Sequence, residues 1–137
     1  RSDMQRHSAQ WFQALDALIG ERGDLPFAWG SNDCCTFAAD WVQTVRGADP
    51  MVDLRGLTSV TDAMRALEGA GGLLAAVTAR MSEPLPGTMA QAGDVAMVVH
   101  GNGRRSMGVC LGAYVAAPGE AGLLMVPITD AEAAWRV

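Results

Sequence analysis

The chain has 137 residues, half of them hydrophobic and 18% charged, with a formal net charge of −5. This length suits one domain with a hydrophobic core, and the apolar content excludes an intrinsically disordered chain. The negative charge argues against nucleic acid as a partner, because non-specific binding needs a basic surface. No apolar run reaches the roughly 18 residues of a membrane span, and the polar first residues lack the apolar centre of a signal peptide.

Apolar residues recur at helical spacing through the first 80 residues. Trp11, Leu15 and Leu18 form one such stripe, and glycines follow the ends of the first three periodic segments. The pattern predicts four helices, over residues 8–22, over 34–45, from a cap at Thr58 or Ser59 to the break at Gly69, and over 73–80.

The second half of the chain has the composition of short β-strands. Strands are predicted over residues 94–99, 106–111, 114–117 and 123–126, a loop over 82–93, and a last helical turn over 130–135. Asn102-Gly103 is the strongest local signal for a hairpin between the first two strands. Helices followed by an antiparallel sheet predict a single α+β domain over 1–137, with a helical part over about 8–80 and a β part over about 94–126.

A tight turn leads directly into a pair of cysteines at the start of the central helix. Asp33 is a good N-cap residue, which puts Cys34 and Cys35 in the first helical turn. The partial positive charge of a helix N-terminus favours a thiolate, so Cys34 is a candidate nucleophile. The alternative is that Cys34 is packed as a small hydrophobic side chain on the helical face that also carries Phe37 and Trp41.

Three sequence motifs, taken in order, resemble those of a known family. They are Trp29-Gly30 with Asn32 to Phe37 (NDCCTF), Gly93-Asp94-Val95, and Ser106 to Gly112 (SMGVCLG). Together they are similar to the NlpC-type cell-wall peptidases, which are papain-like cysteine enzymes. Four features are most similar to a phage-encoded branch found among tail genes: the Cys34-Cys35 doublet, the GVCLG strand within 106–112, residues 116–119 (AAPG), and the closing VP…AWRV pattern of residues 126–127 and 134–137.

The resemblance implies a papain-like NlpC-type fold and a Cys–His mechanism, in which a thiolate attacks an amide carbonyl and a histidine moves the proton. Residue by residue, Asp33, Cys34 and Cys35 match the nucleophile motif. Ser106 stands where the general-base histidine is expected, and the third, orienting position falls near Ala117. Serine cannot act as a base near neutral pH, so the chain carries the family's nucleophile without its two partners.

His100 is the candidate substitute base, because His7 precedes the first helix and is expected to be solvated. A two-residue Asn102-Gly103 turn would pair His100 with Arg105 and Val99 with Ser106. Neighbouring residues on a strand alternate between its two faces, so His100 would then point away from Ser106. A different loop register would reverse this.

These observations favour a structural or assembly protein of a phage tail tip or baseplate, on an NlpC-like fold that has lost peptidase activity. Its expected partners are other tail proteins, its expected place is the virion tail, and assembly would occur in the host cytoplasm. The alternative is an active cysteine peptidase or amidase that uses Cys34 to cut peptidoglycan stem peptides. No metal or cofactor is expected, because the three cysteines lack C-x-x-C spacing, and a centre held by them would need ligands from another chain.

Overall fold

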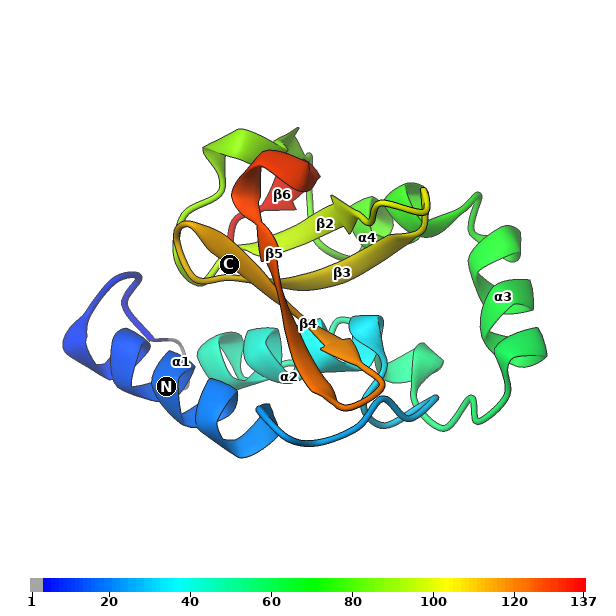
Figure 1. Ribbon diagram of the computed structural model, residues 1–137, viewed down its shortest axis with the longest axis horizontal. Helices are drawn as coiled ribbons and strands as arrows, with labels where there is room; N and C mark the ends of the chain where they lie inside the picture. Colours follow the sequence, from blue (N-terminus) through cyan, green and yellow to red (C-terminus); the bar gives the residue numbers. More distant parts are fainter. Residues whose placement is uncertain (1–3) are drawn as a thin grey trace.

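The computed structural model describes residues 4–137 and is an α+β structure (Figure 1). Four α-helices come first among these residues: α1 (Ala9–Arg22), α2 (Cys34–Arg46), α3 (Val60–Gly69) and α4 (Leu73–Arg80). They are followed by six strands: β1 (Leu85–Pro86), β2 (Val95–Val99), β3 (Arg105–Cys110), β4 (Tyr114–Gly119), β5 (Gly122–Pro127) and β6 (Ala131–Trp135). Short 3-10 helices lie at Val52–Leu54, Gly87–Met89 and Ile128–Asp130.

The strands form one antiparallel sheet in the order β1-β6-β2-β3-β4-β5. The predicted helical turn over 130–135 is wrong, because most of this segment is strand β6, which pairs with β1 and β2. Its residues Ala133, Ala134 and Trp135 are buried, so burial between two strands overrides the helical preference of alanine. The predicted 82–93 loop likewise contains β1.

The β2–β3 hairpin is offset by one residue from the prediction. Val98 pairs with Ser106 and Val99 pairs with Arg105, so the loop between them holds three residues, 101–103. Gly103 takes a left-handed φ of +83°, which is typical of three-residue hairpin loops. The amide of Arg104 donates to Asn102 Oδ1 at 2.9 Å, and this side-chain contact helps to fix the longer loop.

Helix α2 packs on the sheet through two parts of the core. Phe37, Trp41 and Val45 pack with Trp11 of α1 and Val109 of β3. A second cluster joins α2 to β2, β3 and β6: Cys35, Ala38, Val42, Met97, Met107 and Trp135. Figure 1 shows α1 and α2 along one side of the sheet and α3 standing apart from it, and none of the residues of α3 is buried. The central helix is therefore the element that carries the cysteines onto the sheet.

Candidate functional site

The N-terminus of α2 is held by a capping box. Asp33 Oδ1 accepts a hydrogen bond from the Thr36 amide at 2.8 Å, and Thr36 Oγ1 accepts one from the Asp33 amide at 2.9 Å. Asp33 Oδ2 also accepts the Gly30 amide at 2.8 Å, so the same carboxylate fixes the preceding turn. Because these contacts satisfy otherwise free amides, the helix begins at Cys34, as the sequence predicts.

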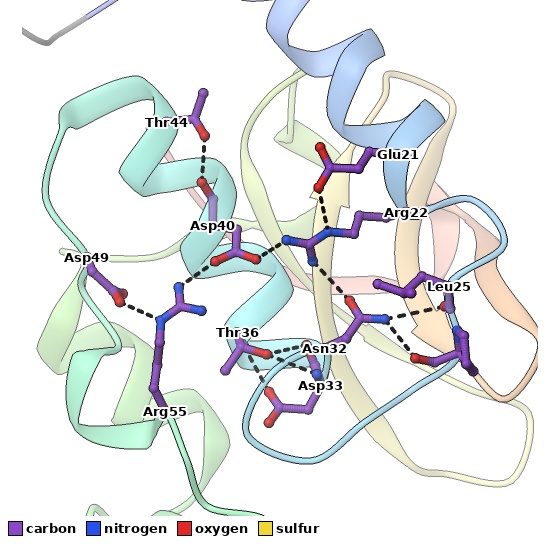
Figure 2. A network of polar contacts seen from close by, with 11 residues as sticks. Glu21, Arg22, Leu25, Asn32, Asp33, Thr36, Asp40, Thr44, Asp49 and Arg55 are labelled. Atoms are coloured by element: carbon purple, nitrogen blue, oxygen red, sulfur yellow. Dashed lines mark hydrogen bonds and ion pairs between the residues drawn. The ribbon is translucent and has the colours of Figure 1, made fainter.

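A network of charged side chains holds the loop that leads to this cap (Figure 2). Arg22, at the end of α1, pairs with Asp40 of α2 and donates to Asn32 Oδ1 at 3.0 Å. Asn32 in turn donates to the carbonyl oxygens of Leu25 and Pro26 at 3.3 and 3.0 Å. Hydrogen bonds therefore hold the loop between α1 and α2 near its start, at Leu25 and Pro26, and near its end, at Asn32. They set the direction in which the chain enters α2.

The network continues on the other side of Asp40. Arg55 Nη2 lies 2.6 Å from Asp40 Oδ1, and Arg55 Nε donates to Asp49 Oδ2 at 2.6 Å. Asp40 thus links the segment before α2 to the segment after it. Sequence reasoning missed these residues, because their partners lie up to 18 positions away and follow no helical or strand spacing.

Cys34 is half-buried beside β3, where hydrogen bonds from the Cys35 thiol, the Cys35 backbone and the Met107 backbone favour its thiolate. The contact with the Cys35 thiol lowers the pKa of Cys34, as does a hydrogen bond from the Met107 backbone, while burial and the charge of Asp33 oppose these effects. Met97 and Met107 form a non-hydrogen-bonded pair of the β2–β3 ladder, so the Met107 amide points away from β2. The register of the sheet therefore supplies an amide donor to Cys34.

The pKa of Cys35 is shifted in the opposite direction to that of Cys34. Its hydrogen bond to Cys34 and its own burial hold the pKa of the Cys35 thiol well above the ordinary value. The pair therefore keeps the proton on Cys35 and places negative charge on Cys34 when one of them ionises. Cys110 lies in the core, and burial raises the pKa of its thiol as well.

A narrow, largely apolar cavity of about 40 Å³ adjoins the two cysteines. It is lined by Trp29, Asp33, Cys34, Cys35, Leu54, Leu57, Ala63 and Leu67. Two of these residues, Ala63 and Leu67, belong to α3, which therefore covers the cavity without contributing a buried residue to the core. The cavity offers the sulfur of Cys34, whose pKa is lowered, and apolar walls, and its lining contains no imidazole.

Ser106 and His100 contact each other. His100 Nε2 lies 2.6 Å from Ser106 Oγ, and both side chains are half-buried. The predicted separation of these two residues is wrong, because the three-residue loop pairs Ser106 with Val98 and so puts His100 on the same face as Ser106. This is the face opposite to that of Met107, whose side chain packs toward α2.

The two groups of motif residues are not joined to each other. In residues 4–137, no hydrogen bond or ion pair connects Cys34 or Cys35 with His100 or Ser106, and His100 lines a different cavity, with residues 129–132. The position expected for the third catalytic group, Ala117, is fully buried and has no polar side chain. His7 is bound elsewhere, with Nε2 2.9 Å from the carbonyl oxygen of Ala92.

Fold and site together define an α+β domain in which a polarised cysteine pair begins the central helix and lies against an antiparallel sheet. Residues 6–137 match the model of a family described as a domain of unknown function, DUF6950, and the chain belongs to this family. No curated protein matches the chain. Within the described residues, no helix is long and apolar enough to cross a membrane, and no cluster of three or more potential ligands could hold a metal ion.

Proposed function

We propose that this chain is a structural or assembly protein of a phage tail tip or baseplate, built on a papain-like, NlpC-type domain without peptidase activity. One observation carries the loss of activity: Ser106 takes the place of the general base, and its hydroxyl is engaged by His100 rather than by Cys34. A papain-like enzyme needs an imidazole within hydrogen-bond reach of its sulfur.

The contacts of Cys34 support this proposal. Its hydrogen-bond partners are Cys35 and the Met107 backbone, neither of which can take up a proton near neutral pH and return it to a leaving group. In a serine protease, removing the base alone costs roughly a millionfold in kcat, about as much as removing the whole triad. A retained nucleophile therefore supplies little catalysis, and a fold can persist after its chemistry is lost.

The assignment to a phage tail rests on sequence resemblance. The features that carry it are the Cys34-Cys35 doublet, the strand over 106–112, the 116–119 turn and the closing residues 126–127 and 134–137. The expected partners are other tail-tip or baseplate proteins, and the expected location is the virion tail after assembly in the host cytoplasm. The capping box and the Arg22–Asp40–Arg55 network suit this role, because a rigid domain presents a fixed surface to its neighbours.

Complementation of a phage that lacks this gene tests the proposal. A Cys34→Ala variant is expected to restore tail assembly and infectious titre to the level of the original sequence. In parallel, the purified protein is expected to leave peptidoglycan stem peptides uncut. Cleavage of those peptides by the original chain, with activity abolished in Cys34→Ala, would overturn the proposal.

One observation favours the alternative of an active cysteine peptidase or amidase. Cys34 is partly exposed, and the contact with Cys35 lowers its pKa, which is what a nucleophile requires. The base would then come from another chain of the assembly. This alternative predicts that intact tails cleave stem peptides and that tails carrying Cys34→Ala do not, whereas the isolated protein is inactive in both forms.

A further inference from the structure

We propose that Ser106 and His100 form a serine nucleophile and its general base, a second acyl-transfer site that is distinct from Cys34 and accepts small carboxylic esters. The distance of 2.6 Å between Ser106 Oγ and His100 Nε2 lies at the short end of the range found for paired nucleophiles and bases. Nε2 is also the nitrogen that receives the proton in serine hydrolases. This proposal does not depend on the function proposed above.

The backbone of the hairpin positions both side chains. Ser106 lies opposite Val98, and His100 follows two residues later, so the two side chains share one face of the sheet. The His100 amide donates to the Arg104 carbonyl at 2.8 Å, and the Gly103 amide donates to the His100 carbonyl at 2.8 Å. Because these bonds close the loop at His100 itself, the imidazole is held by the sheet and not by a free loop.

An open cavity of about 380 Å³ lies beside the imidazole. It is lined by Val99, His100, Gly101, Thr129, Asp130, Ala131 and Glu132. A cavity of this size has room for a small ester beside His100, whose imidazole contacts Ser106 from the edge of the cavity, although Ser106 itself does not line it. The amide of Gly101, at the rim, forms no hydrogen bond within the described residues and is available to the oxygen of a bound carbonyl group.

Two carboxylates lie at the rim of this cavity. The exposed carboxylate of Asp130 has no hydrogen bond or ion pair within residues 4–137. Glu132 is paired with Arg105, with Oε2 2.9 Å from Nε. The carboxylate of Asp130 would therefore favour uncharged or cationic esters over anionic ones.

The chemical step follows from this geometry. Ser106 Oγ forms a bond to the carbonyl carbon of the ester while its proton passes to His100 Nε2. The bond from that carbon to the alkoxy oxygen then breaks, and the alcohol leaves with the proton from His100. Water, deprotonated by the same nitrogen, attacks the acyl-serine and releases the carboxylic acid and Ser106, so no further reactant is needed.

A fluorophosphonate probe tests the site, because it reacts with activated serine hydroxyls and releases fluoride as the serine oxygen bonds to phosphorus. We expect the full chain to be labelled at Ser106, as located by peptide mass spectrometry, and Ser106→Ala to remain unlabelled. His100→Gln keeps a polar side chain at this position but cannot act as a base, and it should lower the labelling rate by roughly 100-fold or more.

Matched controls separate this site from general reactivity. His7→Gln removes the other histidine, which contacts a backbone carbonyl, and Ser82→Ala removes an exposed serine, so neither should change the labelling rate. Near-UV circular dichroism verifies that each variant is folded. The proposal is overturned if folded original protein is not labelled at Ser106, or if folded His100→Gln is labelled as fast as the original.

Discussion

The carboxylate of Asp94 is fully buried and lies 2.6 Å from Nη1 of Arg6, 88 residues earlier in the chain. Arg136 contacts the other oxygen at 2.8 Å, and the Gln91 amide donates to that oxygen at 2.8 Å. One buried side chain thus joins the segment before α1, the start of β2 and the end of β6. These contacts tie together three segments that are far apart in the sequence.

Replacing Asp94 by Asn should lower the free energy of unfolding by about 3 kcal/mol, because it removes the charge of a buried carboxylate that accepts hydrogen bonds from two partly exposed guanidinium groups. Urea unfolding followed by far-UV circular dichroism measures the change. The control is Asp53→Asn, which breaks the solvent-exposed pair with Arg80 and should cost about 1 kcal/mol or less. Equal losses in the two variants would contradict the role assigned to Asp94.

Gly93 and Gly103 allow a second matched comparison, between the effects of the same glycine-to-alanine substitution on stability. Both have left-handed backbone angles, with φ of +90° and +83°, but a Cβ on Gly93 would lie 2.2 Å from the Trp11 ring, whereas a Cβ on Gly103 would meet nothing within 4 Å. Gly103→Ala should therefore cost only the backbone strain, about 1 kcal/mol. Gly93→Ala adds the overlap with Trp11 and should cost about 3 kcal/mol in the same unfolding measurement. Similar values for the two variants would show that the contact with Trp11 is easily relieved.

The sequence predicts the central helix well and the sheet less well, for physical reasons. Asp33 as a cap and the spacing of Phe37 and Trp41 are local signals, and the helix begins at the expected residue. The strand over 131–135 is set by pairing with β1 and β2, which no local pattern reveals. Asn102-Gly103 predicts a hairpin correctly but not its loop length.

The one-residue offset in the β2–β3 hairpin determines which side chains meet at the candidate sites. With the predicted register, His100 faces away from Ser106. With the observed one, the two are hydrogen-bonded, and the Met107 amide points toward Cys34. The contact between Cys34 and β3 depends on how α2 packs on the sheet, and this long-range relationship is not encoded in the spacing of either segment.

The cap of α2 should contribute measurably to stability. Asp33→Ala removes acceptors for the amides of Gly30 and Thr36 and should lower the free energy of unfolding by about 1–2 kcal/mol. Asp33→Asn retains a side-chain oxygen that can accept one of these amides, so it should recover at least half of that loss. If Asn is as damaging as Ala, the negative charge of Asp33, rather than the hydrogen bond that caps the helix, is what stabilises the turn.

The reactivity of Cys34 should depend on its neighbour Cys35. The Cys35 thiol donates to Cys34 and lowers the pKa of Cys34, so Cys35→Ala should raise that pKa and slow the alkylation of Cys34 by iodoacetamide at pH 7. Because hydrogen bonds to charged groups contribute about 1.5–3 kcal/mol, the rate should fall roughly tenfold or more. Cys35→Ser keeps a donor at the same place and should retain most of the original rate. Peptide mass spectrometry distinguishes Cys34 from the buried, slowly reacting Cys110. If Cys35→Ala leaves the rate unchanged, the backbone hydrogen bonds from Met107 and residue 35, and not the Cys35 thiol, account for the lowered pKa of Cys34.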